Sequence, residues 1–208
     1  MITLDDVRAA LALTEFDVSA AQLHMAPGTR GFFPKPDAPP REAGVLVLLY
    51  PGDSGLCVLL TRRTKNIRDH SGQISFPGGK RDPHDESFTA TALREACEEL
   101  GICDEPMTIL GELTTIYIPP SNFEVHPTVA AMNSVPHITA NPREVEEVFA
   151  LPLRDLLDHS IKRTETRDFN GYKVEIPYYA VNGQQVWGAT AIMLSEFEHR
   201  LRAVVGMG

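Results

Sequence analysis

Two apolar segments, AGVLVLLY at residues 43–50 and GLCVLLT at residues 55–61, place the strongest constraint on the fold of this chain. The turn-forming cluster PGDSG separates them. Apolar segments of this length on either side of such a turn predict a β-hairpin of buried strands. The chain must therefore form a sheet and supply other elements to cover it.

Strand patterns return along the rest of the chain. Asn182-Gly183 is the strongest short-range turn signal and predicts a second hairpin over residues 171–188. The remaining predicted strands are residues 73–79, 107–120, 123–132 and the first part of 145–158, which leads into a short helix.

Three segments carry helix signals. Thr3, with Asp6 three residues on, opens a short helix through about Leu13. The second helix begins at a cap, either Asp85 or Ser87, and ends at Gly101, and the third covers residues 189–205. Between the first helix and the first strand, five prolines in residues 27–40 predict an extended arm over the surface.

The order of these elements predicts the fold class. It indicates a mixed β-sheet flanked by helices, in an α+β or α/β/α arrangement. A doubly wound fold is not expected, because strands and helices do not alternate in a βαβ pattern. The length of 208 residues is compatible with one domain over residues 1–208, in which residues 1–43 form the N-terminal helix and the proline-rich arm.

The charge of the chain limits its partners. A net charge of -9 argues against a general nucleic-acid-binding protein, which needs a basic surface. Residues 61–81 nevertheless hold six basic residues against one acidic residue, Asp69. Such a patch favours a compact anion as partner, although a solvated basic hairpin has the same composition.

Several features point to the cytoplasm. The start of the chain, MITLDDVRAA, lacks the basic and apolar regions of a signal peptide, and the longest apolar run, residues 45–50, is too short to cross a membrane. Cys57, Cys97 and Cys103 form neither a CxxC pair nor an even set, so we expect reduced thiols that pack. We expect no membrane partner, and the oligomeric state stays open, a homodimer included.

Glu95, Glu98 and Glu99 crowd one helix over residues 92–102. At about 100° per residue, they lie within roughly a third of the helix circumference. The opposite face is predicted to pack in the core and consists of Ala90, Leu93, Cys97 and Leu100. Carboxylates are ligands for Mg²⁺ or Mn²⁺, so the crowding predicts a metal site. The alternative is a solvated helix face with an Arg94–Glu98 pair.

The segment before this helix favours the metal site. FPGGKRD, at residues 76–82, places two glycines where the backbone can approach a ligand closely. A Gly-Gly pair alone is a weak signal. Gly-Gly-Lys followed by REAxEExGI at a fixed interval is specific.

This pattern resembles the box of the Nudix hydrolases, G-x5-E-x7-R-E-U-x-E-E-x-G-U, where U is a bulky apolar residue. The matching residues are Gly79, Arg94, Glu95, Glu98, Glu99, Gly101 and Ile102, with the small Ala96 at the first U. A one-residue insertion leaves either Asp85 or Glu86 as the early acid of the box.

A second motif, at residues 59–79, resembles LLTxRSxxxRxxxGxVxFPGG of the coenzyme A pyrophosphatase branch, and the two motifs together cover residues 59–102. The resemblance implies Mg²⁺- or Mn²⁺-dependent hydrolysis of coenzyme A, or of its acyl form, to 3′,5′-ADP and 4′-phosphopantetheine. The alternatives are another Nudix substrate, such as ADP-ribose, and a non-catalytic Nudix-fold regulatory module.

The resemblance also implies residue roles. Glu95 and Glu99 would be the main metal ligands, and Arg94 would fix a carboxylate. Glu98 would be a further ligand, directly or through water, and a candidate to orient the nucleophile. The residues expected to bind substrate are Arg63, Arg68, Gly78, Gly79 and Lys80, with the backbone around Gly78 offering a carbonyl to the metal.

Two further groups have open roles. Glu144, Glu146 and Glu147 either supply a general base or form a solvated strand edge. Four aromatic residues either stack on adenine or pack in the core: Tyr117, Phe123, Tyr178 and Tyr179.

Overall fold

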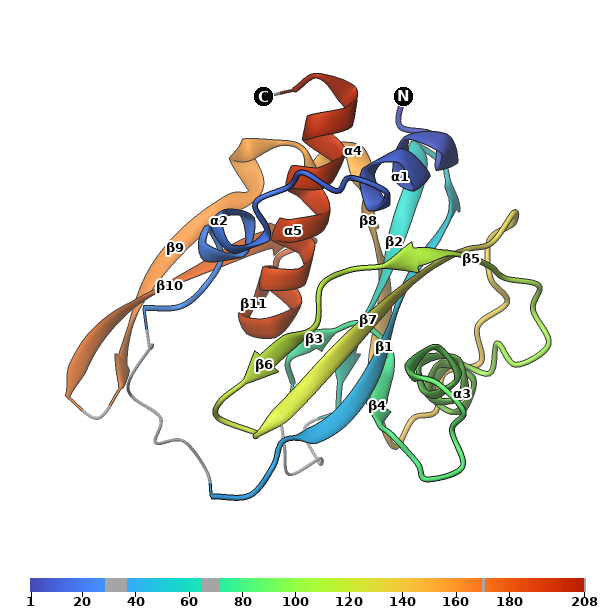
Figure 1. Cartoon of the computed structure of the whole chain (residues 1–208), viewed down its shortest axis with the longest axis horizontal. Helices are drawn as coiled ribbons and strands as arrows, with labels where there is room; N and C mark the ends of the chain where they lie inside the picture. Colours follow the sequence, from blue (N-terminus) through green and yellow to red (C-terminus); the bar gives the residue numbers. More distant parts are fainter. Residues whose placement is uncertain (29–36, 65–71, 170, 208) are drawn as a thin grey trace.

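A mixed β-sheet lies between helices on both of its faces, as the sequence predicts (Figure 1). The structure, a computed structural model, describes residues 1–28, 37–64, 72–169 and 171–207. Within them no helix is both long and apolar enough to cross a membrane. The organisation of residues 1–208 as one domain stays a prediction.

Strand β1 (Arg41–Gly52) is the centre of the eight-stranded sheet. Its second half pairs antiparallel with β2 (Gly55–Arg63), which confirms the predicted hairpin. Its other edge pairs parallel with β7 (Phe123–Ala131) over nine positions. β8 (Val145–Pro152) continues the sheet beyond β2.

Two predicted strands are each divided in the structure. Residues 73–79 form β3 (Ile74–Ser75), which pairs with β2, and β4 (Gly78–Lys80), which pairs with the first half of β1. Residues 107–120 form β5 (Thr108–Glu112) and β6 (Ile116–Ile118), and both pair with β7. β1 therefore has β4 beside its first half and β2 beside its second half.

A separate three-stranded sheet consists of β9 (Lys162–Phe169), β10 (Tyr172–Val181) and β11 (Gln184–Trp187). The β10–β11 hairpin turns at Asn182-Gly183, both with positive φ, as predicted. The sequence analysis missed β9, because its residues KRTETRDF are mostly polar and carry no apolar alternation.

Helices α1 (Leu4–Leu11), α2 (Val18–Leu23) and α5 (Gly188–Val205) lie on one side of the large sheet, and α3 (Phe88–Leu100) lies on the other (Figure 1). The Thr3–Asp6 capping box opens α1 as predicted. The sequence analysis missed α2, which is only six residues long. The chain between β8 and β9 forms α4 (Leu153–Leu156) and the 3₁₀ helix η1 (His159–Ile161).

Helix α3 begins and ends as predicted, but it packs with a different face. Ser87 caps the start and Gly101 ends the helix. The buried apolar residues are Ala92, Ala96 and Leu100, whereas the predicted core residues Ala90, Leu93 and Cys97 are only partly buried. Glu99 is buried on the same side, so the expected separation into a core face and an opposite carboxylate face is wrong.

The reason is how closely α3 lies on β1. A Cβ at Gly44 of β1 would be 2.5 Å from the Phe88 carbonyl oxygen and 2.9 Å from Thr91 Cβ. Because Gly44 has no side chain, α3 can approach with its small residues and turn Glu95 and Glu99 toward β4.

The cysteines differ in part from the expectation. Cys57 is a buried free thiol. Cys97 and Cys103 form a disulfide across the turn at the end of α3, so the expectation of three reduced thiols is wrong for this pair. The turn at Gly101 reverses the chain and brings Cys103 back beside the last turn of the helix.

Candidate functional site

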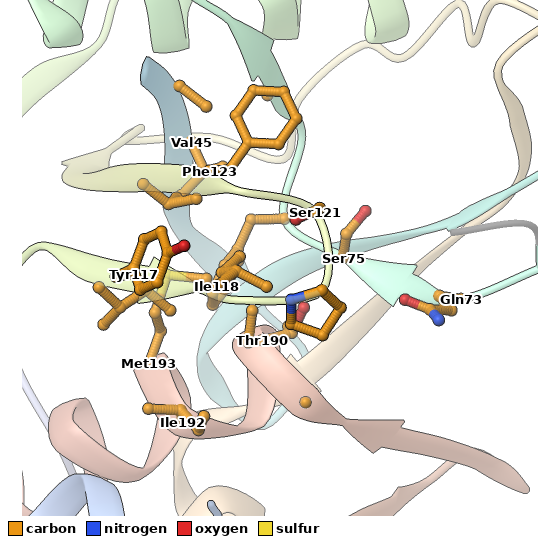
Figure 2. Close-up of a pocket in the computed structure, with 18 of the residues that line it drawn as sticks. Val45, Gln73, Ser75, Tyr117, Ile118, Ser121, Phe123, Thr190, Ile192 and Met193 are labelled. Carbon is orange, nitrogen blue, oxygen red and sulfur yellow. The ribbon is translucent and has the colours of Figure 1, made fainter. Parts of the chain in front are cut away.

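A cavity of about 1070 Å³ lies between the β1–β4 edge, α3, β6 and the start of α5. Figure 2 shows Val45 and Phe123 on one wall, with Thr190, Ile192 and Met193 of α5 across from them. The charged side chains among its described lining residues are Arg63, Lys80, Glu95, Glu99 and Glu144. These include two of the three glutamates that crowd α3.

Glu99 is the most buried of these carboxylates, with 3% of its side chain exposed. It accepts a hydrogen bond from the Gly78 N–H at 3.3 Å and lies 3.4 Å from Arg63 Nη1. Burial raises the pKa of Glu99 to about 7, although Arg63 and the Gly78 N–H act in the opposite direction. Its buried negative charge is therefore only partly compensated.

Glu95 lies one helical turn before Glu99, with 16% of its side chain exposed. A Cβ at Gly79 would be only 2.4 Å from Glu95 Oε2, so this contact requires a glycine. Burial raises the pKa of Glu95, against the opposing effect of Arg94. The second glycine of FPGGKRD thus leaves room for a carboxylate.

Arg94 holds the acids around it. Its Nε and Nη2 donate to the two oxygens of Asp85 at 3.0 and 2.9 Å, and its Nη1 donates to Glu95 at 2.9 Å. Its hydrogen bonds hold the pKa of Asp85 well below its usual range. Of the two candidates for the first acidic position of the motif, Asp85 rather than Glu86 therefore reaches Arg94. The one-residue insertion lies in the loop before Ser87.

Glu98 lies differently from the other two glutamates. Its side chain is 54% exposed, bonds Arg94 at 3.3 Å, and is not among the residues that line the cavity. In the described part of the chain, no three His, Cys, Asp or Glu side chains are arranged to hold a metal ion. The structure therefore brings Glu95 and Glu99 together at the cavity and leaves Glu98 at the surface.

Two neighbouring arginines at the end of β2 have different surroundings. The pairing of β2 with β8 is irregular between Arg62 and Arg63. Arg62 pairs with Glu147 at 2.9 Å and lies 3.6 Å from Glu146, whereas Arg63 lines the cavity. In both arginines Nε is buried and has no hydrogen-bond partner among the described residues. An irregular ladder often redirects a side chain in this way, here toward the acids.

The remaining predicted substrate-binding residues are divided. Gly78, Gly79 and the exposed Lys80 lie on β4 at the cavity wall. Arg68 lies outside the described residues.

Glu144 is the one member of its acidic stretch that lines the cavity. Asn141 Nδ2 donates to Glu144 Oε1 at 3.0 Å, and the charge of Glu144 helps to raise the pKa of both Glu95 and Glu99. Glu146 and Glu147 instead form the solvated strand edge with Arg62. The sequence contains no local signal that separates Glu144 from its neighbours.

The predicted aromatic residues also divide. Tyr117 and Phe123 line the cavity, and Tyr117 is partly exposed. Tyr179 is fully buried and donates a hydrogen bond to Glu198. Tyr178 is not among the lining residues.

Glu95 and Glu99 fit a divalent metal ion. They offer hard oxygen ligands four residues apart on one helix, and both lie against β4. Burial raises the pKa of both, so a cation at this place would offset a repulsion that the protein leaves in part uncompensated. One or two carboxylates with water and phosphate oxygens are the usual surroundings of Mg²⁺.

Comparison with known proteins gives consistent matches. A family model described as the NUDIX domain matches residues 40–171. A protein from Pectobacterium atrosepticum, described as an uncharacterized Nudix hydrolase NudL, is 35% identical over 199 residues, which cover 90% of this chain and 93% of that protein. A protein of the same description from Photorhabdus laumondii is 33% identical over 145 residues, or 70% of this chain and 77% of that protein.

A solved structure supports the fold. The crystal structure of a MutT protein from Methanosarcina mazei Go1 superposes with a TM-score of 0.52 at 22% identity and covers 81% of this chain and 97% of that chain. At this identity the likeness concerns the fold alone.

Proposed function

Because the chain belongs to the Nudix hydrolase family, we propose that it hydrolyses the diphosphate bond of coenzyme A or its derivatives, releasing 3′,5′-ADP and 4′-phosphopantetheine or its acyl form. The observation that carries the proposal is the pair of incompletely compensated carboxylates, Glu95 and Glu99, at the charged end of a large cavity. The coenzyme A branch is favoured by the resemblance at residues 59–79.

The charged end of the cavity suits a diphosphate. Arg63 lines it with a guanidinium whose Nη1 makes a long ion pair with Glu99 at 3.4 Å and whose Nε has no hydrogen-bond partner among the described residues. Guanidinium groups bind phosphate oxygens at two points. Arg63 would hold one phosphate, with Lys80 on β4 and, by resemblance, Arg68 as further cations.

Nudix hydrolases generally need a divalent metal ion. Here Mg²⁺ or Mn²⁺ would be held by Glu95 and Glu99 and would neutralise the phosphate oxygens and make bound water more acidic. Arg94 donates a hydrogen bond to Glu95 and another to Asp85. Asp85 holds Arg94 in place, and Arg94 in turn fixes the Glu95 carboxylate. The exposed Glu98 would act on the metal only through water.

The hydrolytic water needs a proton acceptor. Among the described lining residues, Glu144 is the carboxylate that lies outside α3, and Asn141 donates a hydrogen bond to one of its oxygens. We assign Glu144 the role of general base: it would accept the proton while the water attacks phosphorus in line and the bridging oxygen leaves.

Replacing Glu144 tests this role. Glu144→Gln is expected to lower kcat by about 10²-fold, because an amide accepts no proton at neutral pH. Glu146→Gln, two residues along the same stretch, is the matched control and should leave kcat unchanged. Equal activity of both variants would remove Glu144 from the mechanism.

The proposed substrate is tested by a metal-dependent hydrolysis screen. Coenzyme A, dephospho-coenzyme A and ADP-ribose are incubated with Mg²⁺ or Mn²⁺, and the products are identified by mass spectrometry. We expect coenzyme A to be hydrolysed fastest, with both phosphate-bearing products and no turnover in the presence of a chelator. Faster hydrolysis of ADP-ribose would overturn the choice of substrate.

A further inference from the structure

The segment before β8, residues 139–144, is hydrogen-bonded to the end of α3. The N–H of Thr139 donates to the Leu100 carbonyl at 2.8 Å. The N–H of Asn141 donates to the Glu99 carbonyl, also at 2.8 Å. Both carbonyls belong to the last turn of the helix, where main-chain acceptors lack a partner within the helix itself. The last turn of α3 therefore fixes the position of this segment.

Asn141 connects that turn to the proposed general base. Its N–H binds α3, and its side-chain amide donates to Glu144 Oε1 at 3.0 Å. The Asn141 carbonyl also accepts from the N–H groups of Glu144 and Val145, at 3.0 and 2.9 Å, so these residues form a tight turn. A shift at the end of α3 would therefore pass through Asn141 to Glu144.

A disulfide closes the same end of α3. The bond joins Cys97 to Cys103, and the loop that it closes contains Glu99 and Leu100, whose carbonyls hold the segment before β8. Cys103 is exposed and Cys97 is partly buried, and exposed disulfides exchange with small thiols more readily than buried ones. A bond that closes so short a loop restricts the unfolded chain little. Its loss is therefore expected to loosen the turn and to leave the fold in place.

The third cysteine of the chain has different surroundings. Cys57 lies on β2 with 3% of its surface exposed, and burial raises the pKa of its thiol. Thiol–disulfide exchange requires an accessible thiolate, so Cys57 should be inert. The accessible pair is the one at the end of α3.

We propose that Cys97 and Cys103 form a reversible redox site, which exchanges with small monothiols and their disulfides and controls the position of Glu144. The effect on hydrolysis rests on the proposed function, whereas the exchange itself does not involve the substrate. In the oxidised form, the closed turn holds Asn141 and Glu144 at the cavity. In the reduced form, the last turn of α3 frays and holds Glu144 less firmly.

Reduction proceeds in two exchange steps. The sulfur of a monothiol such as glutathione bonds to Cys103 Sγ while the protein S–S bond breaks, and Cys97 Sγ takes the electron pair and the proton that the monothiol gives up. A second monothiol attacks the mixed disulfide, which releases Cys103 as a thiol and the two monothiols as their own disulfide. Two electrons and two protons pass to the protein, and the small disulfide reverses both steps.

The test compares hydrolysis by the oxidised and the reduced protein. Each form is prepared with glutathione disulfide or glutathione, which is then removed, and is checked by thiol labelling and mass spectrometry. Acetyl-coenzyme A is the substrate, because its blocked sulfur does not exchange with a disulfide. We expect kcat to fall by about tenfold on reduction with KM unchanged, since a displaced base keeps only part of its effect.

Variants at the cysteines assign this response. Cys97→Ser and Cys103→Ser should each have the lower kcat after either treatment, because neither can form the disulfide. Cys57→Ser is the matched control and should respond as the wild-type protein does. An equal response in all three variants would overturn the assignment to this pair.

Glu144→Gln tests whether the effect passes through the base. With the base removed, this variant should have the same lowered kcat in both redox states, whereas Glu146→Gln should keep the tenfold response. A further tenfold loss in Glu144→Gln on reduction would show that the turn acts on another group, and it would overturn the proposed link.

A second readout needs no hydrolysis. Hydrogen exchange of main-chain amides should become faster in residues 139–145 of the reduced protein, because the N–H groups of Thr139 and Asn141 lose their acceptors on α3 for part of the time. Strand β1, which is paired on both edges at the centre of the sheet, is the internal control and should exchange equally in both states.

The outcomes separate this proposal from the proposed function. Equal kcat and equal exchange in the two states would overturn the redox site and leave coenzyme A hydrolysis intact. A pair that stays reduced in glutathione disulfide would also overturn it. A protein that hydrolyses no coenzyme A derivative, yet exchanges faster in residues 139–145 on reduction, would refute the proposed function and support the redox site.

Discussion

Helices α3 and α5 cover opposite faces of the same sheet, and both carry buried glutamates, but these glutamates have different partners. On α5, Glu198 is fully buried and has hydrogen bonds from Lys162 at 2.8 Å, Tyr179 at 2.7 Å and Arg202 at 2.8 Å. Burial alone would raise the pKa of Glu198, yet these bonds hold it below its ordinary value.

On α3, Glu99 has only longer contacts, at 3.3 and 3.4 Å, and burial raises its pKa. A buried charge whose partners are complete belongs to the fold, and a buried charge whose partners are incomplete is available to a ligand. The difference in partners, more than burial itself, distinguishes Glu198 from Glu99, which we propose as a metal ligand.

The largest effect is expected where the partners are complete. Glu198→Gln removes the negative charge that pairs with the buried Arg202 and the partly buried Lys162, so the free energy of unfolding should fall by about 3–5 kcal/mol in urea titrations. Glu42→Gln, which removes an exposed pair with Arg81, should cost less than about 1 kcal/mol. Equal losses in both variants would contradict the comparison.

Glu99→Gln should have the opposite profile. Its kcat for diphosphate hydrolysis should fall by about 10²–10³-fold, because a preorganised charge at the reacting phosphate is lost. Its free energy of unfolding without metal should not fall. Unchanged activity would instead favour a non-catalytic Nudix-fold module.

The pH dependence of stability in the metal-free protein tests whether the buried charge of Glu99 is incompletely compensated. The folded pKa of Glu99 is about 7 against an ordinary value of 4.5, so the neutral form contributes stability that is complete below pH 4.5 and lost as the pH rises through about 7. Relative to Glu99→Gln, the wild-type protein should therefore lose roughly 3 kcal/mol over this range. Chemical unfolding of both proteins at several pH values measures the difference, and parallel curves would exclude it.

The smallest effect is expected at Asp85. Asp85→Asn weakens the hydrogen bonds that hold Arg94, so kcat should fall by about tenfold. An effect of this size is typical of residues that orient a ligand-binding group. Glu86→Gln is the matched control and should have wild-type kinetics. The reverse order would assign the early acid of the box to Glu86.

Local signals could be predicted from the sequence, because they act within a few residues. Thr3 with Asp6, the turn at Asn182-Gly183 and the end of α3 at Gly101 all occur where expected. The candidate acids Glu95 and Glu99 also follow from the motif that contains them.

The features that could not be predicted from the sequence depend on tertiary packing. The helix wheel assumes that the larger apolar residues face the core, but α3 buries Ala92 and Ala96 because β1 offers no side chain at Gly44. Glu144 reaches the cavity through the placement of the segment before β8, which no local pattern encodes. The approach of Cys103 to Cys97 depends likewise on the chain reversal after α3.

Gly44 restricts which substitutions this protein can accept in β1. The nearest atoms to an added Cβ include the Phe88 carbonyl oxygen at 2.5 Å and the Ala92 amide nitrogen at 3.0 Å, and main-chain atoms cannot rotate away as a side chain could. Any larger residue must lift α3, and with it both acids, away from the strand that faces them. A homologue therefore cannot replace Gly44, the cross-strand partner of Gly79, without also changing where Glu95 and Glu99 lie relative to β4.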